Sequence, residues 1–221
     1  MRAALAILAK DLRIEWRTRE SVSGVFVMGV LLLVVFSIAH DARPDAAPAL
    51  LPAVLWVTFV FTGLPAVQRA FLLERENDCL AGLLTAPLDP GALYAGKCAA
   101  NVVVLAATQA VVVPLAGLFL HVDLLPGLPG LVLVLLLGNL GVAALGTLFA
   151  AVAARTRARD LLLPLLLLPL LVPLLIGAVT ATRTVLDAGV GAALPGLRVL
   201  AAFDVVFGVA GWLLFGYVVR D

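Results

Sequence analysis

The stretch QRAFLLERENDCLAGLLTAP, residues 68–87, decides the fold because it is a charged segment set between long apolar ones. Of the 221 residues, 63% are hydrophobic and 13% are charged. Soluble domains average about 45–50% apolar and about 25% charged residues. The mean hydropathy of the chain is +1.16. This composition predicts a protein whose main solvent is lipid, with a short segment that faces water.

Six apolar runs surround this segment, and each approaches or exceeds the ~20 residues that a helix needs to cross a bilayer. They lie at about 21–39, 49–68, 98–121, 127–153, 160–182 and 200–219. In lipid the backbone polar groups must be satisfied internally, and the alternation typical of β-barrel strands is absent from the sequence. The sequence predicts an all-α integral membrane protein with six transmembrane helices in a single domain, 1–221.

The basic residues alternate between loops, and this distribution predicts the orientation of the chain. If the N-terminus is cytoplasmic, twelve of the 15 Lys and Arg residues lie inside, and Arg43, Arg183 and Arg198 lie outside. The twelve are Arg2, Lys10, Arg13, Arg17, Arg19, Arg69, Arg75, Lys97, Arg155, Arg157, Arg159 and Arg220. An even number of spans then places the C-terminus in the cytoplasm as well.

Before the first span, apolar side chains recur at spacings of three and four, and basic side chains fall opposite them. The apolar ones are Leu5, Leu8, Leu12 and Trp16, and the basic ones are Lys10, Arg13 and Arg17. The pattern predicts an amphipathic helix over 3–18 that lies against lipid headgroups at the inner interface. Such a helix either anchors the terminus or also touches a cytoplasmic partner.

The segment 69–90 is predicted to be cytoplasmic. The second span is expected to continue as helix to about Arg75, and Asn77 or Asp78 would cap a short helix over 79–85. Asp89 and Pro90 form an N-cap and N1 pair for the next helix. A solvated loop is the simpler alternative, but leucines beside charges favour docking into a groove of another protein. The candidate contact residues are Arg69, Phe71, Glu74, Arg75, Glu76, Asn77, Asp78, Leu80, Gly82, Leu83 and Leu84.

The fifth span contains Pro164, Pro169 and Pro173. Each proline removes a backbone donor and disturbs the carbonyl four residues earlier. We therefore expect this helix to be kinked or partly unwound at a candidate gate. Its freed carbonyls need protein or water neighbours, which favours a position facing the bundle or another subunit.

Patterns that would indicate chemistry within the chain are weak. The sequence GALYAGKC, residues 91–98, nearly matches a phosphate-binding loop, but Cys98 replaces the required hydroxyl and no strand precedes it. We interpret the match as coincidence, so any ATP must be hydrolysed by a separate chain. Cys79 and Cys98 form no Cys-x-x-Cys pair, which disfavours a redox role. No catalytic triad or metal-ligand pattern is seen, so the chain is predicted to be neither an enzyme nor a holder of a bound cofactor.

Three residues remain as candidate outer contacts. His40 and His121 are predicted near outer helix ends, where they are either haem contacts or ordinary interfacial residues. Asp204 is predicted near the outer end of the sixth span. A carboxylate within a membrane is a functional candidate by default, although Arg198 could simply be its partner.

The sequence ERENDCLAGLLTAP, residues 74–87, resembles the E-R-E-x-G-T-L-E-x-L stretch that follows the second span of ABC-2 type permeases. It departs from that pattern at 78–79 and at Ala81. Together with Leu12-Arg13, Leu55-Trp56-Val57 and the proline-rich 161–176, it is similar to the haem exporter protein B family (CcmB). That family is the permease-like component of cytochrome c maturation, and the resemblance covers essentially the whole chain.

The resemblance implies an ABC-2 (type V exporter-like) fold in a bacterial inner membrane. It also implies a homodimer that binds two copies of an ABC ATPase (CcmA), with spans one and five as candidates for the dimer interface. Further implied partners are a haem-handling membrane protein (CcmC), a small adapter (CcmD) and a periplasmic haem chaperone (CcmE). ATP hydrolysis would drive release of the haem-loaded chaperone, and haem is the implied cargo.

Two other functions fit the same fold. One is an ABC-2 permease that exports a lipid, a polysaccharide or a drug-like molecule, since fold does not fix the substrate. It would need a polar path, yet the spans offer few polar groups beyond Asn101, Thr108, Gln109 and Asn139. The other is a membrane scaffold that transports nothing and needs no ATPase. No feature of the sequence suggests a nucleic-acid partner.

Overall fold

The structure is a computed structural model that describes residues 2–18, 20–41, 47–76, 89–153 and 159–220. All the regular structure in these residues is helical. The helices are α1 (Arg2–Thr18), α2 (Glu20–Asp41), α3 (Ala47–Glu76), α5 (Pro90–Phe119), α6 (Leu128–Ala153), α7 (Arg159–Ala188) and α8 (Leu194–Arg220). The all-α prediction agrees with this architecture.

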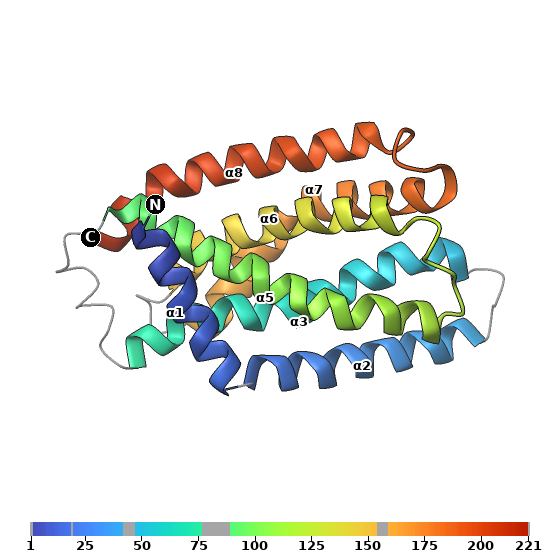
Figure 1. The fold of residues 1–221 in the computed structure, drawn as a ribbon, viewed down its shortest axis with the longest axis horizontal. Helices are drawn as coiled ribbons and strands as arrows, with labels where there is room; N and C mark the ends of the chain where they lie inside the picture. Colours follow the sequence, from blue (N-terminus) through green and yellow to red (C-terminus); the bar gives the residue numbers. More distant parts are fainter. Residues whose placement is uncertain (1, 19, 42–46, 77–88, 154–158, 221) are drawn as a thin grey trace.

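The helices α2, α3 and α5 to α8 run roughly along the long axis of the molecule, and α1 crosses one end of this bundle at a steep angle (Figure 1). The start of α1, the end of α3, the start of α5 and the end of α8 all lie at this end. We call it the terminal end. The helix α3 ends there at Glu76 and α5 begins there at Pro90, so the segment that joins them starts and finishes at the terminal end.

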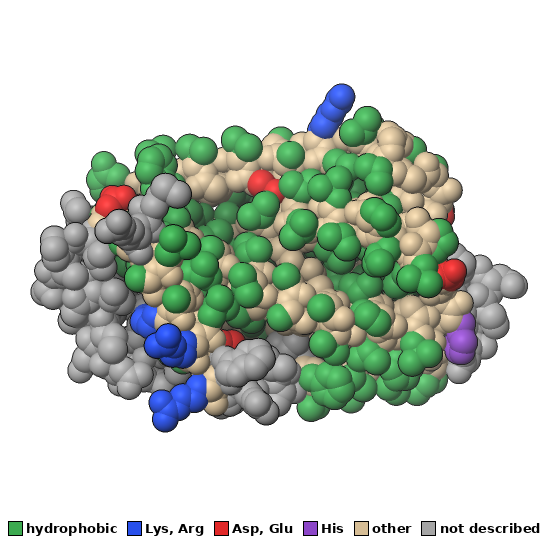
Figure 2. Space-filling view, in the orientation of Figure 1, with side chains coloured by type: hydrophobic (Ala, Val, Ile, Leu, Met, Phe, Trp, Pro, Cys, Tyr) green, Lys and Arg blue, Asp and Glu red, His purple; other side chains and the backbone are tan. Residues whose placement is uncertain are grey.

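Five helical stretches are long and apolar enough to cross a membrane: Ala49–Gln68, Pro90–Phe119, Leu128–Ala153, Pro164–Ala188 and Leu194–Val219. The helix α2 has 22 residues, and its described part contributes a shorter apolar stretch, Phe26–Ala39. Hydrophobic side chains cover the long side of the molecule that faces the viewer in Figure 2, and most of the Lys and Arg side chains coloured there gather at the terminal end. The chain is therefore a membrane protein.

The helix α6 lies at the centre of the bundle, where small residues let neighbouring helices approach closely. A Cβ atom at Gly138 would overlap the indole ring of Trp56 on α3, and one at Gly146 would lie 2.7 Å from Val67. Close contact through small residues is a common means of packing helices in membranes, where lipid provides no hydrophobic drive between them.

The helix α7 continues from Arg159 to Ala188 through all three of its prolines. The unwinding that we considered from the sequence is therefore not seen, and a role of the prolines as a kink or gate stays a prediction. Pro169 and Pro173 are exposed, while Leu167 and Leu171 on the other face are buried. These two prolines thus face away from the bundle of their own chain.

Candidate functional site

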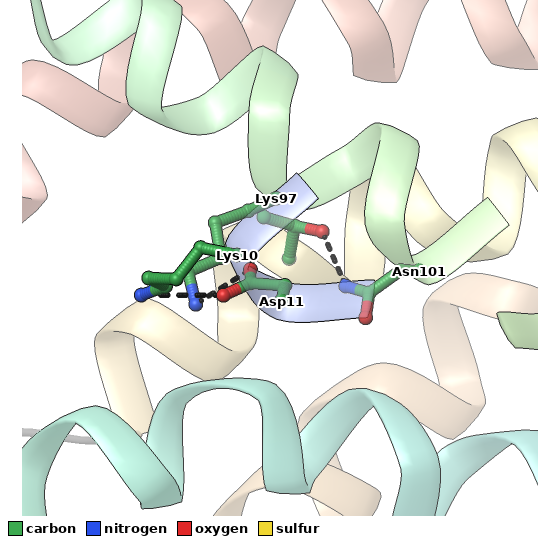
Figure 3. Close-up of polar contacts among 5 residues, drawn as sticks. Lys10, Asp11, Lys97 and Asn101 are labelled. Carbon is green, nitrogen blue, oxygen red and sulfur yellow. Dashed lines mark hydrogen bonds and ion pairs between the residues drawn. The ribbon is translucent and has the colours of Figure 1, made fainter. Parts of the chain in front are cut away.

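A buried ion pair joins α1 to α5 at the terminal end (Figure 3). The ammonium nitrogen of Lys97 lies 3.0 Å from Oδ2 of Asp11, and the Lys97 side chain is 0% exposed. The nitrogen of Lys10 lies 3.2 Å from Oδ1 of the same carboxylate. Since a buried charge is costly unless it is paired, the carboxylate of Asp11 helps to stabilise Lys97, and the pair helps to hold α1 on α5.

The face of α1 that contacts the bundle differs from the predicted apolar face. Ile7 is buried, whereas Leu5 is 61% exposed. A Cβ atom at Gly96 of α5 would lie 2.9 Å from the carbonyl oxygen of Ala4 and 2.9 Å from Cβ of Ile7, so this glycine lets the two helices approach. Sequence reasoning missed Ile7 and Asp11 as a docking face; their spacing of four residues was the available signal.

Residues 91–98, which resemble a phosphate-binding loop, lie inside α5. Each residue that produced the match has a packing role. A Cβ atom at Gly91 would overlap the Trp212 indole of α8, Gly96 admits α1, and Lys97 pairs with Asp11. A helical backbone uses its N–H groups for its own hydrogen bonds, so this stretch cannot form the phosphate cradle. Pro90 begins the helix as predicted, although the carboxylate of Asp89 makes no capping hydrogen bond.

Polar side chains inside the bundle bond to one another across helices. Nδ2 of Asn101 donates to Oγ1 of Thr147 at 2.9 Å, and the amides of Gln109 and Asn139 exchange two hydrogen bonds at 2.7 Å. Three of the four polar residues noted in the sequence therefore hold α5 against α6, whereas the hydroxyl of Thr108 donates to the carbonyl of Val104 within α5. A cavity of about 10 Å³ beside Gln109 and Asn139 has room for a single water molecule.

Two further interior hydrogen bonds connect distant helices. Nε1 of Trp56 on α3 donates to Oγ1 of Thr182 on α7 at 2.9 Å. The hydroxyl of Tyr94 on α5 donates to the carbonyl of Ala144 on α6 at 3.0 Å. These bonds satisfy groups that would be costly to bury alone, and they tie α3 to α7 and α5 to α6.

Asp204 lies deeper than the sequence suggested. The helix α8 begins at Leu194, ten residues before Asp204, which places the carboxylate about 15 Å along the helix. Both carboxylate oxygens are buried and have no hydrogen-bond partner among the residues that the structure describes. Arg198, the partner considered from the sequence, is exposed, and no ion pair between the two is found in the described part of the chain. A Cβ atom at Gly141 of α6 would lie 2.8 Å from Oδ1.

The histidines lie at the end of the bundle opposite the terminal end. His121 is exposed just after α5, with a φ of 52°, and its backbone N–H donates to the carbonyl of Leu118. His40 lies in the last turn of α2, and its side chain is outside the described part. A haem contact at either residue stays a prediction.

Most of the predicted contact segment cannot be placed by the structure. Residues 69–76 form the last turns of α3, but their side chains are outside the described part, and 77–88 lie outside it altogether. The contacts predicted for Arg69, Phe71, Glu74, Arg75, Glu76, Asn77, Asp78, Leu80, Gly82, Leu83 and Leu84 therefore stay predictions.

Comparison with known proteins identifies the family. The family model described as CcmB protein matches residues 2–215. The chain belongs to the CcmB protein family. This membership confirms the resemblance seen at 74–87 and 161–176, since the match includes both stretches.

Curated CcmB relatives carry the name heme exporter protein B. The protein from Paracoccus denitrificans is 36% identical over 160 residues, which cover 72% of each chain. The protein from Bradyrhizobium diazoefficiens is 31% identical over 216 residues, covering 96% of this chain and 94% of its own. The protein from Rhodobacter capsulatus is 32% identical over 163 residues, covering 72% of each chain. The similarity to this CcmB chain therefore extends from α1 to α8.

Proposed function

We propose that this chain is the membrane permease subunit of an ABC transporter-like complex for cytochrome c biogenesis. It couples ATP hydrolysis by a separate ATPase subunit to haem handling or to release of a haem-loaded chaperone, and it is itself non-catalytic. Membership of the CcmB family and the name that the curated relatives share support this proposal.

The chain crosses the inner membrane six times, with both termini in the cytoplasm. Five stretches are long and apolar enough to cross, and α2, at 22 residues, spans about 33 Å as the sixth. The basic side chains at the terminal end support a cytoplasmic location for that end. Arg183 and Arg198 lie near the ends of α7 and α8 that are remote from it.

The observation that carries the coupling proposal is the buried pair of Lys97 and Asp11. The segment between Glu76 and Pro90 connects α3 to α5 at the terminal end. Lys97 lies seven residues into α5, about 10 Å from Pro90. A force that the ATPase applies to this segment therefore acts on the first turns of α5, and the ion pair passes it to α1. In this way the two cytoplasmic elements move together.

The complete assembly is a homodimer with an ABC-2 exporter-like fold, bound to a CcmA-like ATPase and associated with CcmC-like, CcmD-like and CcmE-like proteins. The exposed face of α7 is the proposed dimer surface, and α2 borders it in the partner. Pro169 and Pro173 cannot donate to the backbone carbonyl groups four residues before them, so these carbonyl groups need other hydrogen-bond donors. The same face carries the exposed side chains of Leu165 and Ile176. A second subunit would cover a surface that one chain leaves open.

Co-purification with the cognate ATPase tests this proposal. Replacing Glu74, Glu76 and Asp78 by Lys reverses the acidic charges of the contact segment and should abolish capture of the ATPase and stimulation of its hydrolysis. Asp187→Lys is the matched control. Its carboxylate belongs to an exposed pair with Arg183 at the remote end, and exposed pairs contribute little to stability. Undiminished ATPase capture by the triple variant would refute the coupling assignment.

A further inference from the structure

A groove of about 430 Å³ opens at the terminal end between the first turn of α5 and the last turns of α8. Its walls carry two aromatic side chains, Trp212 and Tyr217, the carboxylate of Asp89, and the apolar Leu213. Trp212 is 57% exposed and Tyr217 is 72% exposed. The groove borders the first turn of α5, but none of its side chains belongs to the pair of Lys97 and Asp11 or to the proposed dimer surface.

The groove combines the groups that bind an alkylammonium ion. An ammonium group is attracted to the faces of Trp and Tyr rings and to a carboxylate. Asp89 occupies the N-cap position of α5, yet its carboxylate makes no hydrogen bond to the first turn. Asp89 is exposed and lines the groove, so its carboxylate is open to a ligand there. The missing Cβ of Gly91 leaves the space that the indole of Trp212 occupies, which holds one aromatic wall in place.

The position of the groove points to a lipid. Tyr217 lies three residues before the end of α8 at Arg220, at the depth where aromatic belts meet headgroups. From the groove, an exposed apolar strip continues along α8 toward the middle of the membrane through Leu213, Val209 and Val206. An acyl chain can follow this strip while its headgroup stays in the groove.

We propose that the groove binds a phospholipid of the inner leaflet through the ammonium group of an ethanolamine headgroup. Asp89 accepts hydrogen bonds from the ammonium, and the rings of Trp212 and Tyr217 line its site. The proposal rests on the cytoplasmic orientation of the terminal end. The basic side chains of that end favour anionic lipid in general, so a preference for the zwitterionic headgroup would be specific to the groove.

Fluorescence quenching by brominated lipids tests the site on the intact, purified chain. The protein is reconstituted into vesicles that contain equal fractions of phosphatidylethanolamine and phosphatidylglycerol, and the acyl chains of one or the other are brominated. The difference between the unaltered chain and Trp212→Phe isolates the signal of Trp212. We expect brominated phosphatidylethanolamine to occupy the site about fivefold more than brominated phosphatidylglycerol.

Asp89→Asn should remove this preference while the protein stays folded, because the substitution keeps the side-chain shape and Asp89 makes no capping bond. Asp187→Asn, an exposed carboxylate at the remote end, should keep the preference. Equal quenching by the two lipids, or a preference that survives Asp89→Asn, would overturn the proposal. The assay uses neither ATPase nor ATP, so its outcome is independent of the coupling test.

Discussion

Replacing Asp11 while Lys97 stays in place should damage the protein more than the reverse change. In Asp11→Leu the fully buried ammonium of Lys97 loses the carboxylate of Asp11 at 3.0 Å, and breaking a buried pair in this way costs up to about 3–5 kcal/mol. In Lys97→Met the carboxylate that remains is 14% exposed and keeps Lys10 at 3.2 Å, so we expect a loss of about 1 kcal/mol. Both variants remove the pair of Lys97 and Asp11, but Asp11→Leu also removes the contact of Lys10 and leaves a fully buried charge, whereas Lys97→Met leaves a partly exposed one.

The double variant Asp11→Leu with Lys97→Met should recover most of the lost stability. Replacing both members of a buried pair by apolar groups of similar size is often neutral or stabilising. The double-mutant cycle should therefore give a coupling free energy of about 2–4 kcal/mol rather than simple addition. For a chain of this length, 1 kcal/mol corresponds to about 2–4 °C in the unfolding midpoint, so Asp11→Leu should lower it by on the order of 10 °C.

Two measurements read out this prediction. Thermal unfolding of the purified protein gives the midpoint, and limited trypsin digestion reports whether α1 leaves α5, because α1 carries basic cleavage sites at Lys10, Arg13 and Arg17. Rapid cleavage of α1 should appear in Asp11→Leu and disappear in the double variant. Equal effects of the two single variants, or strictly additive effects in the double one, would refute the argument that the pair holds α1.

Three further variants test the interior. Asp204→Asn should leave the unfolding midpoint unchanged or raise it, because neither oxygen has a donor among the described residues; a clear fall would reveal a partner. Gly138→Ala should lower the midpoint by about 2–10 °C, since the added carbon overlaps Trp56, and a neutral result would contradict that packing. Gln109→Leu should cost about 1–3 kcal/mol by leaving the Asn139 amide unpaired. Adding Asn139→Leu should restore most of it, and a further loss in calorimetry would contradict the pairing.

The sequence predicted the features that depend on local composition. The bilayer sets the length of an apolar run, so hydropathy located the five helices that are long and apolar enough to cross a membrane. Proline at 90 marked the start of α5. The exact ends of the helices depend on turns that extend beyond the hydrocarbon layer, and hydropathy does not detect such turns. For that reason α8 begins at Leu194 rather than near 200, and Asp204 lies deeper than expected.

The pairing of Lys97 with Asp11 could not be predicted from the sequence. The two residues are 86 positions apart, and their contact requires α1 to fold back on α5. The same limit applies to Gly91 and Gly96, whose spacing imitates a nucleotide motif while their neighbours, Trp212 and Ile7, come from other helices. The roles of these residues arise from contacts between helices that are distant in the sequence.

The sidedness of the terminal end tests the central claim most directly, because an ATPase can reach the contact segment only from the cytoplasm. Asp78→Cys and, as a control at the remote end, Val190→Cys are placed in a chain whose Cys79 and Cys98 have been replaced by Ser and Ala. A thiol reagent that cannot cross membranes should label position 78 only in inverted vesicles and position 190 only in right-side-out vesicles. Labelling of position 78 from the outside would contradict the account.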